Sequence, residues 1–194
     1  MIQPMPDPDL QLYVTPLTSE RLEEFAAFSC GSEEWQKELD AFLRENALEE
    51  GLYRLNFTYV FYGTDRQPVG YTTLLASQVQ NAQRKSPPLI GETRYSYIPV
   101  LLVGRLAIAQ EHQSHGYGAL ILAWIKDMAR RLEVGCRFVA LHCDERNEAG
   151  IHFYESHGFI TPPLPARQQR LMLFDLLDGT ADNANDQVQG AEGE

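Results

Sequence analysis

The feature that most constrains the fold of this chain is an apolar run followed directly by a glycine-bearing loop and an amphipathic helix. Residues 98–109 read IPVLLVGRLAIA, a run expected of a strand buried on both faces. Residues 113–118 read QSHGYG, and apolar residues then recur at helical spacing to about residue 132. The expected inner stripe of that helix is Leu120, Ile121, Trp124, Ile125 and Met128. A strand, a loop and a helix in this order predict an α/β core.

The loop of residues 113–118 has the composition of an anion cradle. The first backbone N–H groups of a helix have no internal acceptor and lie at the positive end of the helix dipole. Glycine lets a ligand approach the backbone closely, so the pattern predicts a site for a pyrophosphate; a turn without a ligand is the alternative. The chain has no GxxxxGK[ST] segment, and the third glycine of a dinucleotide fingerprint is absent.

The remaining periodicities extend the α/β pattern over one expected domain, residues 10–177. Strands are expected at 10–17, 57–63, 68–79, 137–143 and 170–177. Helices are expected at 20–28, capped by Thr18 or Ser19, at 33–50, ended by Gly51, and at 147–157, ended by Gly158. Residues 1–9 and the acidic tail 178–194 are expected to be disordered. Residues 80–97 form either a substrate-entrance loop or an insertion.

Charge and cysteine content narrow the class of protein. The formal charge is −11, but residues 10–174 carry 19 acidic and 16 basic residues and are nearly balanced. The arginines and lysine at 84, 85, 94, 130, 131, 137, 167 and 170 form either a local basic patch or scattered solvated charge. Cys30, Cys136 and Cys143 have no zinc spacing, so reduced thiols and no metal are expected. With no membrane span or secretory signal, a cytoplasmic protein without membrane contact is expected.

Two motifs resemble those of the GCN5-related N-acetyltransferases (GNAT). The stretch from Gln113 to Gly118 matches the family signature Q/R-x-x-G-x-G/A. Residues 147–159 resemble N-x-x-A-x-x-x-Y-x-x-x-G-F, with Gly150 in place of the usual alanine. We expect this small-for-small difference to be neutral. The two motifs and the strand between them cover about residues 98–160.

The resemblance implies a fold and a cosubstrate. The implied fold is α/β, with a mixed, mostly antiparallel central sheet that is flanked by helices and splayed where acetyl-CoA binds. The loop amides would hold the pyrophosphate, and the preceding strand would offer backbone groups to the pantetheine arm. The implied acetyl-CoA residues are Leu106, Ala107, Ile108, Gln113, Ser114, His115, Gly116, Tyr117, Gly118, Ala119 and Asn147. Asn147 has a second interpretation, as the N-cap of a helix.

The resemblance also implies a general acid. Acetyl transfer to an amine passes through a tetrahedral species, and the departing thiolate needs a proton that a tyrosine hydroxyl can donate. Tyr154 holds that position of the motif; a core tyrosine with a bonded hydroxyl is the alternative. The attacking amine must be neutral. Glu92, His115 and His142 are conceivable helpers, and none is assigned as the base.

The acceptor is less constrained than the acetyl donor. A primary amine of a small molecule or peptide is the first expectation. The segments FSCG, LDAFL and TYV resemble the toxin branch of the family, which acetylates aminoacyl-tRNA and is held in check by an antitoxin. That branch implies tRNA and an antitoxin chain as partners, and the family implies a homodimer as a further alternative. A non-catalytic acetyl-CoA-binding or interaction module is the third class.

Overall fold

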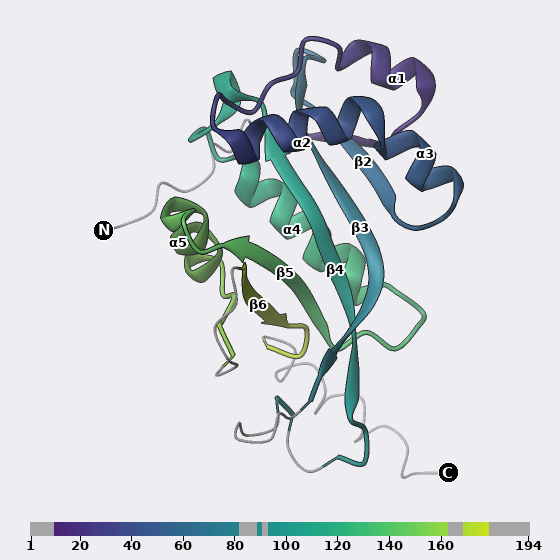
Figure 1. Ribbon diagram of the computed structural model, residues 1–194, viewed down its shortest axis with the longest axis vertical. Coiled ribbons are helices and arrows are strands. Elements are labelled where there is room, and N and C mark those ends of the chain that lie inside the picture. The colour runs from purple at the N-terminus through teal and green to yellow at the C-terminus, as the bar shows by residue number, and fades with distance from the viewer. Residues whose placement is uncertain (1–9, 82–88, 91–92, 163–168, 179–194) are drawn as a thin grey trace, which may run out of the picture. The chain divides into compact units, whose positions relative to one another are not determined.

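The computed structural model describes residues 10–81, 89–90, 93–162 and 169–178 (Figure 1). The residues expected to form the disordered ends lie outside these ranges, apart from Asp178, and so does half of the expected loop at 80–97. The elements in chain order are β1 (Tyr13–Pro16), α1 (Ser19–Glu24), α2 (Glu34–Glu45), α3 (Ala47–Leu52), β2 (Phe57–Tyr62), β3 (Pro68–Gln80), β4 (Tyr97–Ile108), the 3-10 turn η1 (Gln110–His112), α4 (Tyr117–Arg130), β5 (Phe138–Asp144), α5 (Glu148–Ser156) and β6 (Gln169–Asp175).

The strands form a six-stranded, mostly antiparallel sheet in the order β1-β2-β3-β4-β5-β6, which confirms the mixed α/β fold. The register pairs Val14 with Phe61 between β1 and β2, and Ala140 with Leu173 between β5 and β6. Contacts divide the chain into two compact units, residues 1–76 with 102–125 and residues 77–101 with 126–194. The expected splay of the sheet stays a prediction.

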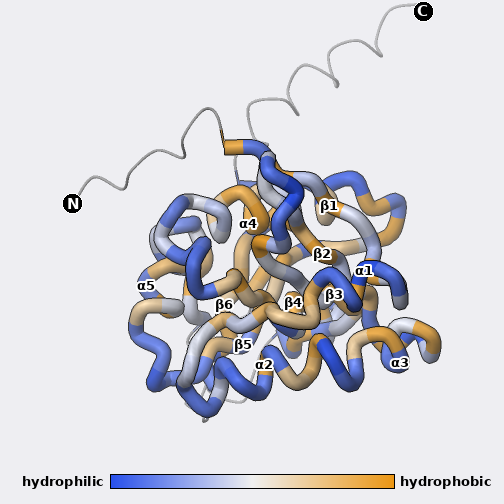
Figure 2. The backbone as a smooth tube through the Cα atoms, turned by 90° about the horizontal axis from the view of Figure 1, so that it is seen from above, coloured by the Kyte–Doolittle hydropathy of each residue, from blue (hydrophilic) through white to orange (hydrophobic). Residues whose placement is uncertain are grey.

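In the first unit, β2 packs against helices on both faces because its side chains alternate. Tyr59 and Phe61 contact the Trp124 ring of α4, with ring centroids 4.9 and 5.4 Å apart. Val60 and Tyr62 point the other way, into a core formed with α1 and α2. Figure 1 shows α2 and α4 on opposite faces of the strands, and Figure 2 shows α4 coloured mostly hydrophobic.

Aromatic residues fill the core between α2 and the sheet. The fully buried Tyr71 packs its ring against Phe42 and donates its hydroxyl to the Leu39 carbonyl at 2.7 Å. Phe25 and Phe28, which follow α1, belong to the same cluster. The short helix α1 is capped by Thr18, as the sequence allowed, because its side-chain oxygen accepts from the Arg21 amide.

The helix expected at 33–50 is interrupted at Asn46, so α2 and α3 are separate helices. Gly51 lies inside α3 rather than ending it. The helix ends in a Schellman motif: the Arg54 amide donates to the Gly51 carbonyl, and the Leu55 amide donates to the Glu50 carbonyl. Arg54, with φ 56°, takes the left-handed position that glycine usually fills.

The second unit packs α5 and the end of α4 against β5 and β6. The Lys126 ammonium lies 3.9 Å from the centroid of the Phe174 ring and donates to the His157 carbonyl at 2.6 Å. Burial lowers the pKa of Lys126 to about 8. Gly158, with φ 82°, ends α5 as expected, because its amide and that of Phe159 reach back to the carbonyls of Glu155 and Tyr154.

Two details differ from the sequence expectations. Strand β4 is not buried on both faces, since Pro99 and Gly104 are exposed and Leu106 is only half-buried. Helix α4 ends at Arg130, two residues earlier than expected, and its buried stripe also includes Leu122 and Ala129. No helix in the described ranges is long and apolar enough to cross a membrane.

Candidate active site

The loop before α4 presents backbone N–H groups at the start of a helix. Ser114 and Gly116 both have positive φ, 63° and 91°, so the chain turns sharply there. The Gly116 carbonyl accepts the amides of Ala119 and Leu120, at 3.1 and 3.2 Å. Within the described part of the chain, these are the first amides of α4 that donate to a backbone carbonyl, so the amides of residues 114–118 are available to an anion.

The side chain of Gln113 holds this loop in place. Its amide nitrogen donates to the Cys30 carbonyl at 2.7 Å and to the Ile108 carbonyl at 3.0 Å. Its backbone carbonyl accepts from the His115 ring nitrogen Nδ1 at 2.7 Å. Both amide hydrogens of Gln113 are thus used within the protein, and this side chain positions the loop.

The FSCG segment provides the other end of that anchor. The Cys30 amide donates to the buried Asp40 carboxylate at 3.0 Å, and the Cys30 carbonyl also accepts from the Gln36 side chain at 2.8 Å. Gly31 has φ 144°, and a Cβ there would lie 2.1 Å from the Gln36 side-chain oxygen. The Cys-Gly pair therefore has a structural reason: a carbonyl that receives two side chains, followed by a residue without a Cβ.

Tyr117 and the end of β4 complete the first unit's part of the site. The Tyr117 ring is buried beside His112, with ring centroids 5.5 Å apart, so the ring packs inside the protein. Ala107 points into the core, whereas Leu106 and Ile108 on the alternate positions are half-buried. A Cβ at Gly70 would lie 2.4 Å from the Ala107 carbonyl oxygen, so this glycine lets β3 and β4 approach closely.

In the second unit, Asn147 caps α5. Its side-chain oxygen accepts from the Gly150 amide at 2.9 Å, which supports the N-cap interpretation. A Cβ at Gly150 would lie 2.5 Å from the side-chain nitrogen of Asn147. The glycine leaves room for the capping side chain, and the expectation that glycine in place of alanine is neutral stays a prediction.

The Tyr154 side chain is half-buried on α5, and its ring packs against Phe159 with centroids 5.7 Å apart. Burial, with a smaller contribution from Cys143, raises the pKa of the Tyr154 hydroxyl above its usual range. The hydroxyl is therefore protonated at neutral pH. This is the protonation state that a proton donor requires.

All three cysteines are free thiols. Cys143 on β5 and Cys30 are buried, and Cys136 is half-buried. Burial and the neighbouring Asp144 carboxylate raise the pKa of the Cys143 thiol to about 11. Its sulfur lies 4.0 Å from the Asn147 carbonyl oxygen. A neutral thiol is a poor nucleophile, so the geometry gives Cys143 a packing role.

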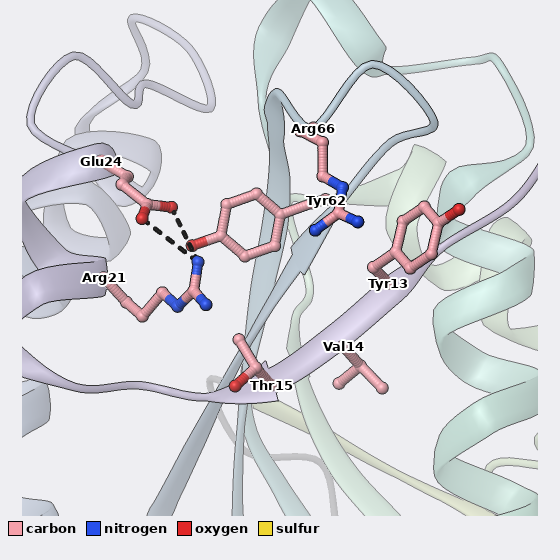
Figure 3. A pocket seen from close by; sticks show the side chains of 7 residues that line it. All are labelled: Tyr13, Val14, Thr15, Arg21, Glu24, Tyr62 and Arg66. Carbon is pink, nitrogen blue, oxygen red and sulfur yellow. Dashed lines mark hydrogen bonds and ion pairs between the residues drawn. The ribbon is translucent and has the colours of Figure 1, made fainter.

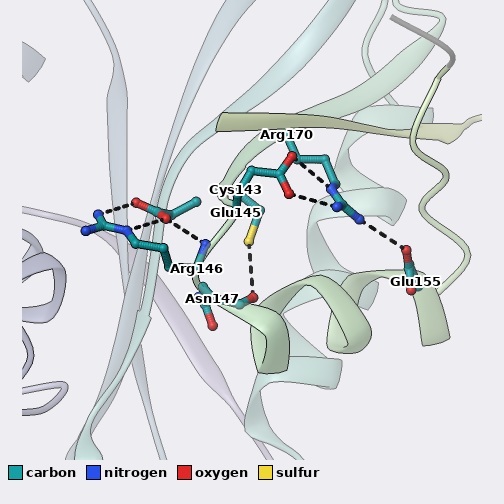
Figure 4. Close-up of polar contacts among 7 residues, drawn as sticks. Cys143, Glu145, Arg146, Asn147, Glu155 and Arg170 are labelled. Carbon is teal, nitrogen blue, oxygen red and sulfur yellow. Dashed lines mark hydrogen bonds and ion pairs between the residues drawn. The ribbon is translucent and has the colours of Figure 1, made fainter. Parts of the chain in front are cut away.

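An ion-pair network that sequence reasoning missed joins β6 to the turn before α5 (Figure 4). The Arg170 guanidinium binds both carboxylate oxygens of Glu145, at 3.2 and 2.7 Å, and lies 3.9 Å from Glu155. These residues come from three elements, and no local spacing in the sequence indicates the network. The pairs hold the segment that carries Asn147 and Tyr154.

Two of the three candidate helpers for amine deprotonation lie in the described part of the chain. His142 and His115 are exposed, and Glu92 lies outside the described residues. No described group of three or more His, Cys, Asp or Glu side chains is placed to hold a metal ion. Of the sequence-predicted residues, those at 106–119 belong to the first unit, and Asn147 and Tyr154 belong to the second.

Comparison with known proteins agrees with these features. Residues 19–159 match the family model described as the acetyltransferase (GNAT) family. AtaTR bound with acetyl-CoA is 27% identical with a TM-score of 0.69, covering 86% of this chain and 95% of that one. AtaT complexed with acetyl-methionyl-tRNAfMet is 25% identical with a TM-score of 0.67, covering 87% and 96%.

A third solved structure shows the same fold. A tyrosine-to-phenylalanine mutant of KacT is 22% identical with a TM-score of 0.72, covering 87% of this chain and 96% of that one. The family model spans well over half of the chain and includes both motifs. The chain therefore belongs to the GNAT family and is an acetyl-CoA-dependent acetyltransferase.

Proposed function

We propose that this enzyme transfers the acetyl group of acetyl-CoA to the α-amine of an aminoacyl group on charged tRNA. The observation that carries the proposal is the similarity, over 87% of the chain, to AtaT complexed with acetyl-methionyl-tRNAfMet. The Cys-Gly segment that anchors Gln113 supports it, because that segment is part of the resemblance to the toxin branch. The first expectation, a small-molecule or peptide amine, has no comparable support.

The residues present fit acetyl-CoA. The amides at 114–118 precede the first internally bonded amides of α4, so they are donors of the kind that a pyrophosphate requires. Leu106 and Ile108 of β4 are half-buried, and we expect the backbone of this stretch to bind a pantetheine arm. Asn147 has a side-chain nitrogen left for the same arm, because its oxygen is used in the cap. Acetyl-CoA supplies the acetyl group as a thioester.

Tyr154 holds the proton for the departing thiolate. Its raised pKa keeps the hydroxyl protonated at physiological pH. A general acid in this position contributes about 10²–10⁴-fold to the rate. We assign no side chain as the base, and we take the amine to enter the site in its neutral form.

Two further predictions follow from the same proposal. A toxin of this kind acts where tRNA is charged, so the protein is placed in the cytoplasm. It is also expected to have an antitoxin chain as its inhibitor, in line with the AtaT toxin bound to the C-terminus of the antitoxin AtaR, a structure 24% identical to this chain. A homodimer stays a prediction from the family.

The test compares acceptors. Purified enzyme is mixed with labelled acetyl-CoA and with charged tRNA, uncharged tRNA, or a panel of small amines and peptides. We expect label on charged tRNA alone, released by mild alkali together with the amino acid because it is attached to the aminoacyl group. Label on small amines with none on charged tRNA would reject the proposal and restore the small-amine alternative.

A further inference from the structure

A pocket in the first unit belongs to neither motif. It has a volume of about 420 Å³ and lies among β1, α1, the end of β2 and the turn that follows (Figure 3). Its lining residues are Tyr13, Val14, Thr15, Arg21, Glu24, Tyr62 and Arg66. The volume falls within the range of about 300–1,000 Å³ common for small-ligand sites.

Tyr62 gives this pocket an unsatisfied polar group. Its side chain is 5% exposed, and its hydroxyl is buried without a hydrogen-bond partner among the described residues. The hydroxyl lies beside the Glu24–Arg21 ion pair, and its polar interaction with each lowers the pKa of Glu24 and raises that of Arg21, although neither contact has the full geometry of a hydrogen bond. A polar ligand atom at this position could give the hydroxyl a hydrogen bond of full geometry, which would be stabilising.

Arg66 gives the pocket an available cation. The guanidinium of Arg21 is paired with Glu24 at 3.2 Å. For Arg66, no carboxylate lies within ion-pair distance in the ranges that the structure describes. Its guanidinium lies 4.9 Å from the centroid of the Tyr13 ring, so cation and aromatic face are presented together.

The backbone holds Arg66 in that position. The Arg66 amide donates to the Gly63 carbonyl, and the Gly63 amide donates to the Gln67 carbonyl, both at 3.0 Å. This is a hairpin turn followed by one left-handed residue, a position that glycine usually fills. Arg66 occupies this position with φ 65°, although the turn does not require a side chain there.

These groups together match the parts of a nucleotide. An aromatic face beside a guanidinium is the arrangement on which proteins stack unpaired bases. An unpaired guanidinium binds a phosphate through charge-assisted hydrogen bonds, and a buried hydroxyl can bond to the edge of a base or to a sugar. We propose that this pocket binds one unpaired nucleotide of the RNA acceptor, with its base against Tyr13 and its phosphate on Arg66.

This inference rests on the proposed function for the identity of the RNA. Acetyl-CoA also carries a nucleotide, so the same chemistry has two sources. The pocket is lined by two arginines and one glutamate, and Glu24 disfavours a nucleotide with several phosphate groups. A single phosphodiester fits that charge better than the three phosphates of coenzyme A, and we therefore assign the pocket to RNA.

The experiment uses two matched arginine substitutions in the full chain. Arg66→Gly removes the guanidinium at a backbone conformation that glycine prefers. Arg54→Gly does the same at φ 56°, outside the pocket, and removes an equal charge. Binding is measured by fluorescence anisotropy with a short, labelled single-stranded RNA, and acetyl-CoA binding is measured by calorimetry.

We expect Arg66→Gly to weaken RNA binding at least about tenfold, and Arg54→Gly to change it by less than about twofold. Tyr62→Phe, which removes only the hydroxyl, is expected to weaken RNA binding about threefold to tenfold. Acetyl-CoA affinity should be unchanged in all three variants. Weaker acetyl-CoA binding with unchanged RNA binding in Arg66→Gly would overturn the assignment in favour of the cosubstrate's nucleotide.

Two other outcomes separate this inference from the proposed function. RNA binding that depends on Arg66, in an enzyme that does not acetylate charged tRNA, would support the pocket and reject the proposed acceptor. Acetylation of charged tRNA with equal KM for wild type and Arg66→Gly, or no binding of the single-stranded RNA by wild type, would overturn the pocket.

Discussion

The side-chain nitrogen of Gln113 lies 2.7 Å from the Cys30 carbonyl oxygen, and this hydrogen bond joins two motifs 83 residues apart. The same nitrogen binds the Ile108 carbonyl at the end of β4. One amide side chain therefore fixes the loop's start against both β4 and the segment before α2. The glutamine of the family signature thus positions the loop, and its contact with acetyl-CoA stays a prediction.

Replacing Gln113 with glutamate tests that role. A carboxylate cannot donate to two carbonyls, and its charge would also repel them and any phosphate at the loop. We expect Gln113→Glu to lower the free energy of unfolding by about 1–3 kcal/mol and to weaken acetyl-CoA binding at least about tenfold. Urea unfolding and calorimetry measure the two effects. Wild-type affinity for acetyl-CoA in this variant would show that the loop does not depend on the anchor.

Gly150→Ala is expected to disturb the Asn147 cap, although alanine is usual in the family at this position. Alanine normally stabilises a helix over glycine by about 0.5–1 kcal/mol. At Gly150 the new methyl displaces the capping side chain, and loss of a cap costs about 1 kcal/mol. No net gain in stability and weaker acetyl-CoA binding are therefore expected.

Gly51→Ala is the matched control, because Gly51 also lies in a helix and a Cβ there meets nothing within 4 Å. Thermal or urea unfolding should show a gain of about 0.5–1 kcal/mol for Gly51→Ala alone. An equal gain in both variants would contradict the account of the Asn147 cap.

The Arg170–Glu145 pair is expected to stabilise the second unit. Arg170→Met removes a bidentate ion pair and should lower the free energy of unfolding measurably. Arg146→Met, at a side chain 85% exposed in the same turn, should change it by less than about 0.5 kcal/mol. Urea unfolding of both variants checks the difference, and equal losses would count against the network.

Stability at alkaline pH should depend on Cys143. Its thiol pKa is about 11 in the folded protein against an ordinary value of 9.0, so between these values the unfolded chain releases a proton that the folded chain keeps. Unfolding is therefore favoured as pH rises from 9 to 11, by up to roughly 1–3 kcal/mol. Cys143→Ala should flatten this part of the pH–stability curve, and an unchanged slope would contradict the buried, protonated thiol.

Local patterns predicted the parts of the fold that depend on local physics. The glycine loop, the Thr18 cap and the Gly158 stop were all predicted, because each depends on a few adjacent residues. The interruption at Asn46 was not, because an apolar stripe continues across it and hides the break. Periodicity alone does not distinguish one bent helix from two.

In the candidate site, too, features within one motif could be predicted from the sequence, whereas contacts between separate elements could not. The Asn147 cap was one of two interpretations that the sequence left open, and the structure confirms it. The Arg170 network and the Tyr13–Arg66 pocket were not, because their members come from separate elements and meet only in the folded chain. At Gly150 the sequence argument considered residue size alone, whereas the folded chain also brings the Asn147 side-chain nitrogen within 2.5 Å of a Cβ placed there.

The most direct test of the central claim is the state of charged tRNA in bacteria that express wild type or Tyr154→Phe. The phenylalanine variant keeps the ring that packs on Phe159 and loses only the proton donor, so it should fold and bind acetyl-CoA as wild type does. We predict N-acetylated aminoacyl-tRNA and growth arrest with wild type, and about 10²–10⁴-fold slower acetylation with Tyr154→Phe. Unmodified aminoacyl-tRNA and normal growth with both proteins would contradict the account.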